Sequence, residues 1–410
     1  VPLHWQTGEF VGEDGWVFFA GAFNAPWTDS LFTPFAGYFR FEARLLAELV
    51  SVLPLAIQPY AYAFVGLGLN AVIISLFYLP GFRHLLASDG RRLVVVGLLA
   101  LAPNAENLGL VTGLHWYLSF ALTLMLVIDP PDHRAGRVMM VVASSVCIWS
   151  SPSALVLLPF FALRWLNVSD PFIKRWSAAI VIQLILFALS VLVLRGTEGT
   201  RSGDFDRGII FLAAEHLMVR GWFVSGIWGR GVAQSLVDWS PLLIDLCGFL
   251  MMAGLGGLMW RTRTNREMGP ILLLVTAALM VMFSLTRTGY IEELAELDLP
   301  RHVRYLTAPT LILIVAIWVL AGRQLAAKSK GWWGLAAVQA VALMVGIRSE
   351  THWSRPPGEF RFRDFTPAIA TFERDYIRQG TPGSLYVPND IPYWGPVLES
   401  AGGELHRPEE

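Results

Sequence analysis

The chain has 410 residues, of which 54% are hydrophobic and 15% are charged, and its formal net charge is −1. Soluble domains carry about 25% charged residues, so this composition disfavours a soluble protein and predicts an all-α, polytopic transmembrane bundle. The near-neutral charge gives no support to nucleic-acid binding. The two cysteines, Cys147 and Cys247, lie in apolar runs and indicate neither a disulfide framework nor a CxxC metal motif.

Residues 1–59 precede the first long apolar run and are predicted to form an extracytoplasmic loop. Within it, the stretch FVGEDGWVFF places two adjacent carboxylates, Glu13 and Asp14, inside an aromatic run. Residues 37–53 follow an amphipathic pattern, which predicts a helix lying along the membrane surface. Because such a loop needs an upstream helix or a cleaved signal to reach the outer side, we expect a further transmembrane helix before Val1.

Ten apolar segments follow, and the sequence predicts a membrane-spanning helix in each of them. Three of the ten, 93–103, 138–149 and 154–165, are shorter than a full crossing. The predicted spans are 60–79, 93–103, 108–128, 138–149, 154–165, 176–194, 241–260, 269–286, 305–322 and 332–347.

The distribution of Lys and Arg sets the predicted orientation of the spans. Alternate connections carry 13 basic residues, whereas the short connections 104–107 and 150–153 on the opposite side carry none. The positive-inside rule therefore places the basic connections in the cytoplasm. These connections are 80–92, 129–137, 166–175, 261–268 and 323–331.

The remaining segments are then extracytoplasmic: the loops 195–240 and 287–304 and the tail 348–410. Residues 208–238 mix tryptophans with arginines and glycines, which predicts a second interfacial segment. The polar tail is too short for a large independent domain. The predicted organisation is thus a first outer loop, a transmembrane bundle over 60–347 and a short outer tail.

Polar groups that are costly at membrane depth gather on the predicted outer side, so each is a candidate site residue. The segment APNAENLGLVTGLHWYLSF places Asn104 and Glu106 at an outer turn. It places His115, followed by Trp116, about 7–8 Å into the next helix, at 1.5 Å of rise per residue. The segment LPRHVRYLTAP adds a cationic cluster where the last outer loop re-enters the membrane, made of Arg301, His302, Arg304 and Tyr305.

These carboxylates and cations together indicate one chemistry. A carboxylate shielded by aromatic side chains can act as a general base toward a hydroxyl. Arginine and histidine at a loop edge can hold a phosphate. The combination favours attack by an acceptor hydroxyl on a phosphate-linked sugar, with the cations stabilising the departing phosphate. A lipid-linked donor would explain why the site lies at the bilayer surface.

Several segments also resemble a known family. The EDG motif in the first outer loop, the amphipathic helix after it and the many spans look like the GT-C superfamily of polytopic membrane glycosyltransferases. The segments PNAEN…TGLHWYLSF and RHVRYLTAP resemble its bacterial members linked to surface polysaccharide or lipid modification. The resemblance covers most of residues 9–320 through short, degenerate motifs. It implies a polyprenyl-phosphate-linked sugar donor and a bacterial inner-membrane protein with an extracytoplasmic active face.

The same resemblance implies roles for particular residues. Asp14 or Glu13 would be the catalytic base, and Arg301 and Arg304 would hold the donor phosphate. The expected helix before the acidic loop also belongs to the family pattern, whereas the short tail departs from members with large periplasmic domains and puts a polymeric or protein acceptor in doubt. We predict no cofactor, although the acids could bind a divalent cation. Further substrate contacts would come from His302, Tyr305, His115, Trp116, Asn104 and Glu106.

Each candidate also has a structural interpretation. Asp-Gly is a common turn dipeptide, which would make Asp14 a solvated turn residue. His115 could be a buried histidine that a neighbouring helix satisfies, and Asn104 could cap a helix. The cluster around Arg301 could anchor lipid headgroups. For Asp245, we favour a structural pair with a neighbouring arginine.

Two other functions remain open. The chain could be a non-catalytic, GT-C-like subunit of a larger membrane complex, since the sequence reveals no partner surface. A transporter or flippase is less well supported, because transporters place charges near the midplane and usually show repeat symmetry.

Overall fold

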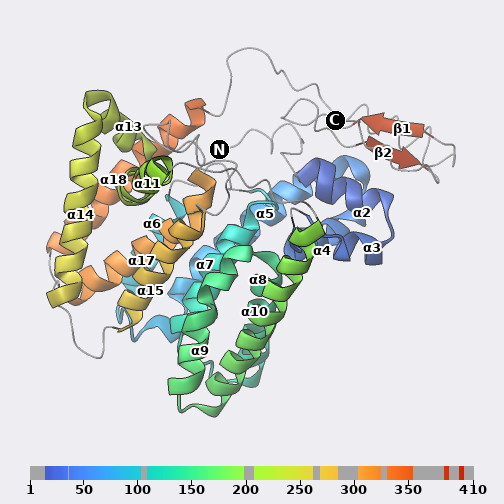
Figure 1. The fold of residues 1–410 in the computed structure, drawn as a ribbon, viewed down its shortest axis with the longest axis horizontal. Helices are drawn as coiled ribbons and strands as arrows, with labels where there is room; N and C mark the ends of the chain where they lie inside the picture. Colours follow the sequence, from blue (N-terminus) through green and yellow to red (C-terminus); the bar gives the residue numbers. More distant parts are fainter. Residues whose placement is uncertain are drawn as a thin grey trace. The chain divides into compact units, whose positions relative to one another are not determined.

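The computed structural model is mostly helical over the residues that it describes, in agreement with the predicted all-α class (Figure 1). It divides into two compact units, described separately below. Unit 1 comprises 1–70, 107–115 and 355–410, and unit 2 comprises 71–106 and 116–354. The residues that the structure describes are 14–35, 37–102, 109–197, 207–261, 268–284, 303–324, 330–353, 383–386 and 397–400.

Unit 1 is built mainly from short helices of the first loop. They lead into the first part of α5 (Gln58–Ser75), and the turn 109–113 leads into the start of α7 (Leu114–Val127). The short helices are η1 (Asp14–Phe19), α2 (Ala20–Asn24), α3 (Trp27–Phe32), α4 (Phe41–Ser51) and η2 (Leu55–Ile57).

The tail contributes an antiparallel strand pair to unit 1 that the sequence did not predict. Strand β1 (Gly383–Tyr386) pairs with β2 (Val397–Ser400), with Gly383 opposite Ser400. Strand β2 also contacts α2. The predicted bundle is therefore supplemented by one small sheet.

Helix α4 confirms the predicted amphipathic helix, but its charged side faces inward. Arg40, which caps the helix, and Arg44 are both buried. By contrast, the apolar Leu49 and Val52 are exposed, Val52 by 81%. Such a helix can turn apolar side chains toward lipid while it directs its cations into the protein.

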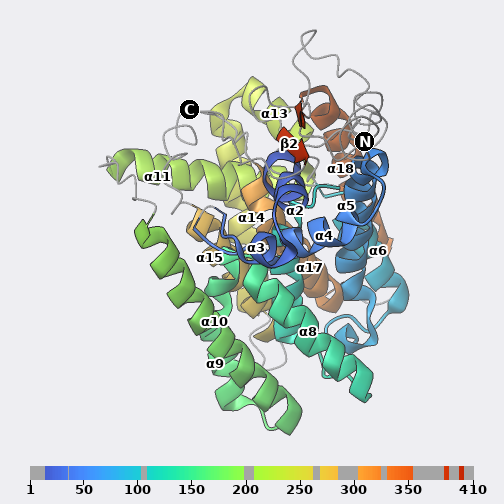
Figure 2. The same cartoon turned by 90° about the vertical axis from the view of Figure 1, so that its right-hand side faces the viewer.

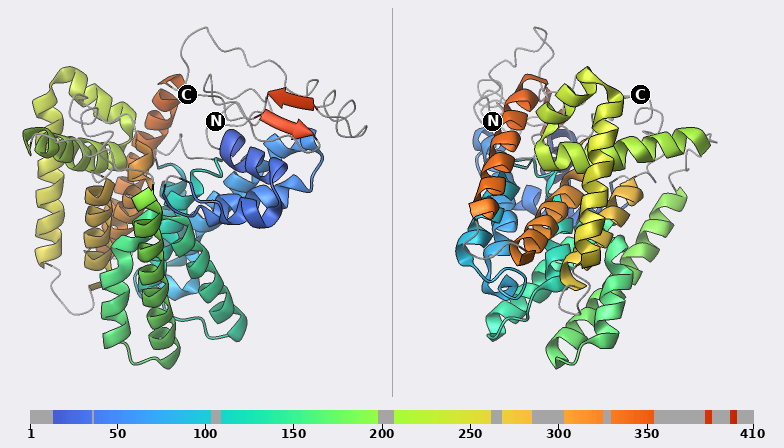
Figure 3. Two further views of the ribbon diagram at one scale, coloured as in Figure 1. Left: turned by 45° about the vertical axis from the view of Figure 1, so that its right-hand side comes forward. Right: turned by 90° about the vertical axis from the view of Figure 1, so that its left-hand side faces the viewer.

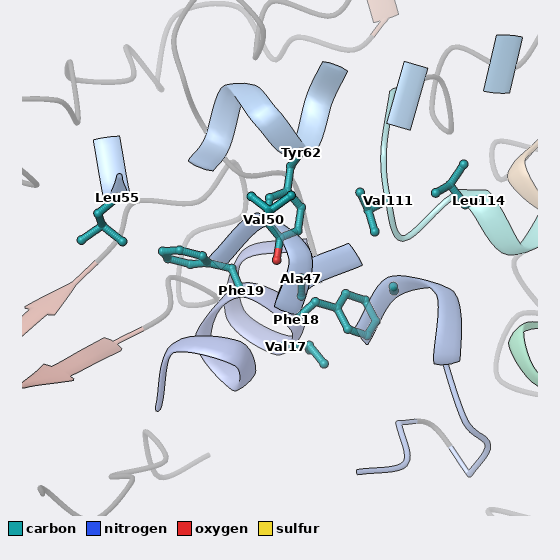
Figure 4. Packing of buried hydrophobic residues seen from close by; sticks show 10 residues of the cluster. Val17, Phe18, Phe19, Ala47, Val50, Leu55, Tyr62, Val111 and Leu114 are labelled. Carbon is teal, nitrogen blue, oxygen red and sulfur yellow. The ribbon is translucent and has the colours of Figure 1, made fainter. Parts of the chain in front are cut away.

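The core of unit 1 lies between the first loop and the ends of the two apolar helices (Figure 4). Phe18 and Phe19 are fully buried, and Phe19 packs edge-on against Tyr62 of α5 with ring centroids 6.4 Å apart. Edge-to-face aromatic pairs contribute about 0.5–1.5 kcal/mol beyond area burial. The aromatic run after Glu13 and Asp14 is thus the packing element that fixes Asp14 in place.

Each of the ten predicted spans contains a helix. In unit 2, these helices are the end of α5, α6 (Asp89–Ala100), most of α7, α8 (Arg134–Ser150), α9 (Leu158–Asn167), α10 (Pro171–Thr197), α14 (Pro241–Arg261), α15 (Met268–Ser284), α17 (Thr307–Gln324) and α18 (Lys330–Trp353). The remaining elements of unit 2 are η3 (Leu76–Tyr78), η4 (Pro80–Phe82), η5 (Pro152–Leu157), α11 (Arg207–Glu215), η6 (His216–Ser225), α12 (Gly226–Trp228), α13 (Arg230–Trp239) and η9 (Val303–Leu306).

The side-chain burial in unit 2 is consistent with a helical bundle that could lie in a membrane. Helix α17 is buried on nearly every face from Thr307 to Leu320, which marks it as the central helix of the unit. Helix α10 instead exposes large apolar residues, among them Leu192 and Val193 at 70% each. Apolar residues on an outer helix face suit contact with lipid.

Not every helix is long enough to cross a membrane by itself. Among the described residues, three helices meet the length and composition of a span, at 58–78, 171–194 and 209–228. Helices α8 and α9 bend by 116° at their junction and count as a fourth when taken as one broken span. Five shorter apolar helices lie in α7, α14, α15, α17 and α18.

The segment that was interpreted as a second interfacial region is helical. Helices α11, η6 and α12 follow one another and are apolar enough to be counted as a candidate span. Yet α11 runs across the direction of α14 in two views (Figures 2 and 3).

Some arginines counted for orientation are buried rather than solvated. Arg91 donates to the Gly322 carbonyl at 3.0 Å and lies over the Trp332 ring, and Arg92 donates to the Leu86 carbonyl at 2.9 Å. These two arginines therefore also connect backbone segments through hydrogen bonds.

Candidate active site

The predicted site residues fall partly within the described chain. The side chains of Asp14, His115, Trp116 and Tyr305 are described. Arg304 is described only in its backbone, within η9. The other candidates lie outside the described residues: Glu13, Asn104, Glu106, Arg301 and His302.

Asp14 is a buried carboxylate that links η1 to the turn before α7. Only 3% of Asp14 is exposed, so it is no solvated turn residue. Its Oδ2 accepts a hydrogen bond from the Val111 N–H at 2.9 Å, and its Oδ1 accepts one from the Thr112 N–H at 2.6 Å. Hydrogen bonds to a charged acceptor are stronger than neutral ones. Asp14 therefore fixes two segments that lie almost a hundred positions apart in the chain.

The Thr112 carbonyl oxygen is bound by two side chains of the site. It accepts a hydrogen bond from Arg40 Nη2 and another from His115 Nδ1, the latter at 2.8 Å. His115 is itself buried, with 7% of its surface exposed. Asp14, Arg40 and His115 are thus all attached to the same short turn.

Glycine is required at two places where this turn approaches α5. Gly109 has a φ of +78°, a left-handed conformation that favours glycine. A Cβ on Gly66 of α5 would lie 2.5 Å from the Gly109 carbonyl oxygen. The turn can therefore sit directly on the helix backbone and bring its N–H groups to Asp14.

The cations at the start of α4 form the other half of the cluster. Arg40 Nε lies 3.2 Å from Glu42 Oε1, and Arg44 Nη1 donates to the Val17 carbonyl at 3.1 Å. Both guanidinium groups stack over the Phe18 ring, at 5.4 and 5.2 Å from its centroid. Burial, with a smaller contribution from nearby Arg40, lowers the pKa of Arg44 to about 10. The cluster therefore holds two cations away from bulk water.

Sequence reasoning missed the roles of Arg40, Glu42 and Arg44. In the amphipathic pattern of residues 37–53, Arg40 and Arg44 lie on the polar face, which is normally directed to water. The signal that could have suggested them is the aromatic run in the same predicted loop, because arginine stacks well on aromatic rings.

Unit 2 brings together two other predicted residues. The rings of Trp116 and Tyr305 meet edge to face, with centroids 5.5 Å apart and an interplanar angle of 88°. These two candidates for substrate contact thus lie on neighbouring elements, α7 and η9. Tyr305 is buried, and Trp116 is partly buried.

Asp245 has the structural partner that we favoured from the sequence. Arg220 Nε and Nη2 donate to the two Asp245 oxygens at 2.6 and 2.7 Å. The arginine lies in the π-helix η6 rather than in a loop. The structural interpretation of Asp245 is confirmed.

Among the residues that the structure describes, no group of three or more His, Cys, Asp or Glu side chains is arranged to hold a metal ion. Comparison with protein-family models, with curated proteins and with solved structures gave no match. The case for a function therefore rests on the site geometry.

Proposed function

We propose that the protein is a GT-C-type membrane glycosyltransferase. It would move a sugar from a polyprenyl-phosphate-linked donor to a hydroxyl acceptor at the extracytoplasmic face of a bacterial inner membrane. The proposal includes the ten membrane spans expected from the sequence.

The observation that carries the proposal is the buried ionisable cluster of unit 1. In a chain with only 15% charged residues, Asp14, Arg40, Glu42, Arg44 and His115 are all buried beside apolar helices. Ionisable groups at such places are costly and by default indicate function. The cluster combines acid, cation and imidazole, which can serve proton transfer and the stabilisation of a departing phosphate.

The proposed roles come from the family resemblance and, within unit 1, from the contacts of the buried cluster. Arg301 and Arg304 would bind the donor phosphate, as the family resemblance implies. Within unit 1, Arg40 and Arg44 would add positive potential. Glu13 or Asp14 would supply the carboxylate, and Asp14 also holds the turn that carries His115. Trp116 and Tyr305 would offer aromatic surface to the sugar or the lipid.

One observation favours a second function, that of a non-catalytic subunit in a larger membrane complex. Both Asp14 oxygens accept backbone N–H groups, and Arg40 binds a backbone carbonyl and Glu42. These bonds join segments of the chain and would be useful even without a substrate. If the chain had lost catalytic activity, the cluster could still be retained because it stabilises the fold.

Sugar transfer in reconstituted membranes separates the two functions. Labelled sugar on polyprenyl phosphate would be supplied to the wild type and to Glu13→Gln and Arg304→Lys variants, with exposed Asp132→Asn as the control. We expect the wild type and the control to transfer sugar, and at least one site variant to remain folded while its turnover falls by 100-fold or more. If the wild type transfers nothing from any polyprenyl-phosphate donor, the subunit function replaces the enzyme.

A further inference from the structure

The end of α4 carries an exposed apolar surface. Leu49, Val52 and Leu53 are exposed and lie within about one helical turn of each other, on the same side of the chain. Ile57 of η2 is exposed by 50% as well. The opposite side of α4 packs into the core of unit 1, for example through Val50 (Figure 4). We call the four exposed residues the elbow surface, and an exposed apolar patch of this kind marks an interaction site.

Gln58 fixes the elbow surface to the start of α5. Its side chain is buried, and its Nε2 donates to the carbonyls of Ser51 at 3.2 Å and of Leu53 at 2.8 Å. Ser51 ends α4, so its carbonyl has no partner within the helix. Gln58 is also the first residue of α5 and of the candidate membrane span 58–78. A hydrogen-bonded bend therefore holds the elbow surface at the end of this span.

The exposed apolar face continues along α5. Phe64 is exposed by 64% and follows Ile57 by seven positions, which is about two helical turns, so both lie on the same side of the helix. An apolar surface that runs from the residues before a span onto the outer face of the span fits a lipid bilayer, because lipid surrounds such a helix. This continuity indicates that lipid covers the elbow surface.

The cations of unit 1 are directed away from the elbow surface. Among the described residues of unit 1, Arg40 and Arg44 are the only lysines or arginines. Both are buried and donate to the carbonyls of Thr112 and Val17, respectively. Attraction to anionic headgroups needs basic side chains near the membrane surface. The described part of unit 1 offers none there, and the charged residue nearest in sequence is the partly buried Glu48.

We propose that the elbow surface docks the first loop on the bilayer by inserting its apolar side chains, without selecting anionic headgroups. The depth would be that of an interfacial helix, roughly 5–10 Å into the boundary between headgroups and acyl chains. Gln58 is the positioning residue, because it holds α4 against the start of the span. The amphipathic pattern alone would instead bring Arg40 and Arg44 toward the headgroups. This docking role goes beyond the proposed function and does not depend on sugar transfer.

A fluorescent probe on the full chain tests the docking. In a background with Cys147→Ala and Cys247→Ala, an environment-sensitive fluorophore would be attached at Val52→Cys and, as the control in water, at Asp132→Cys; both native residues are exposed. The purified protein would be reconstituted into vesicles of zwitterionic phosphatidylcholine, with and without anionic phosphatidylglycerol. We expect the Val52 probe to emit at a shorter wavelength than the control and to be shielded from iodide. Lipids with a spin label near the headgroup should quench it more than lipids labelled near the end of the acyl chain, equally in both kinds of vesicle.

Three results would overturn the proposal. Iodide quenching of the Val52 probe as strong as that of the control would place the elbow surface in water. A short emission wavelength without quenching by spin-labelled lipid would show that a second copy of the chain covers the surface. Insertion that requires phosphatidylglycerol would show selection for anionic headgroups. Each of these results would leave the glycosyltransferase function standing.

Gln58→Met tests the positioning role. Methionine keeps the length of the side chain but has no N–H to donate to the end of α4. We expect the Val52 probe to lose its preference for the shallow spin label, because α4 is no longer held at one depth. Ser51→Ala is the matched control, since it removes only the bond from Ser51 Oγ to the Glu48 carbonyl within α4, and it should keep the preference. An unchanged preference in Gln58→Met would contradict the positioning role.

Discussion

At the scale of single residues, the site depends on hydrogen bonds to backbone groups. Asp14 binds two N–H groups, and Arg40 and His115 share one carbonyl. From the sequence, Asp14 and His115 could be chosen as candidates because polar groups are rare in this chain. Their connection through Thr112 could not be predicted, because it is made by the backbone N–H and carbonyl of this residue, and any residue type supplies these groups.

We expect Asp14→Asn to destabilise the protein even if Asp14 has no catalytic role. The asparagine side chain has one oxygen, so one of the buried N–H groups of Val111 and Thr112 would face an NH₂ group instead. Leaving a buried donor unsatisfied costs about 1–3 kcal/mol. Denaturant or thermal unfolding in detergent would measure the loss.

The control is Asp132→Asn, the same substitution at an exposed aspartate. Exposed substitutions of this kind usually change stability by less than about 0.5 kcal/mol. Equal stability of the two variants would contradict the linking role of Asp14. A loss of activity in Asp14→Asn therefore has to be interpreted together with the measured stability of that variant.

At the scale of elements, the decisive contact is between the turn 109–113 and helix α5. The turn lies on the helix backbone at Gly66, and its own Gly109 adopts a positive φ. The sequence does not indicate that Gly66 and Gly109 are in contact, because 43 positions separate them. Likewise, the pattern of 37–53 predicted the helix α4, whereas its inward-facing cations depend on the buried Phe18 ring.

We expect Gly66→Ala to displace the turn and weaken the protein. The added methyl group would meet the Gly109 carbonyl at 2.5 Å, where no flexible side chain can move aside. Overpacking of this kind costs about 1–3 kcal/mol. In protein labelled with ¹⁵N histidine, the ring shifts of His115 should change as well, because His115 Nδ1 binds the Thr112 carbonyl of this turn.

Gly68→Ala in the same helix is the matched control, since nothing lies within 4 Å of its added Cβ. Alanine is favoured over glycine in a helix by about 1 kcal/mol, so this variant should be neutral or slightly more stable. A similar loss of stability in Gly66→Ala and Gly68→Ala would show that substitution anywhere in α5 destabilises the protein, and that the contact with the turn is not the cause.

At the scale of the whole molecule, the chain is a set of apolar helices with polar connections. Exposed apolar side chains on α10 and the buried course of α17 agree with a membrane environment. The orientation follows from the basic connections alone and stays a prediction. It places the first loop, and with it the buried cluster, outside the cytoplasm.

Thiol labelling in intact cells tests that orientation. In a background with Cys147→Ala and Cys247→Ala, single cysteines would be introduced as Thr28→Cys in α3 and as Asp132→Cys in the predicted inner connection; both native residues are exposed. We expect a membrane-impermeant maleimide to label the first without permeabilisation and the second only after it. The reverse pattern would contradict the extracytoplasmic site.

The sequence by itself predicted apolar helices of the kind that could cross a membrane, the positions of those helices, and Asp14 and His115 as polar candidates in a chain with few charges. These features are local, because the length of an apolar run and the spacing of polar residues are properties of neighbouring positions. Only the tertiary structure decided which charges are buried and what they bind. The partners of Asp14 lie 97 and 98 positions away, and such a pairing depends on how the first loop packs on the end of α5. The strand pair of the tail also depends on tertiary structure, because its two strands are separated in the sequence and pair only in the folded chain.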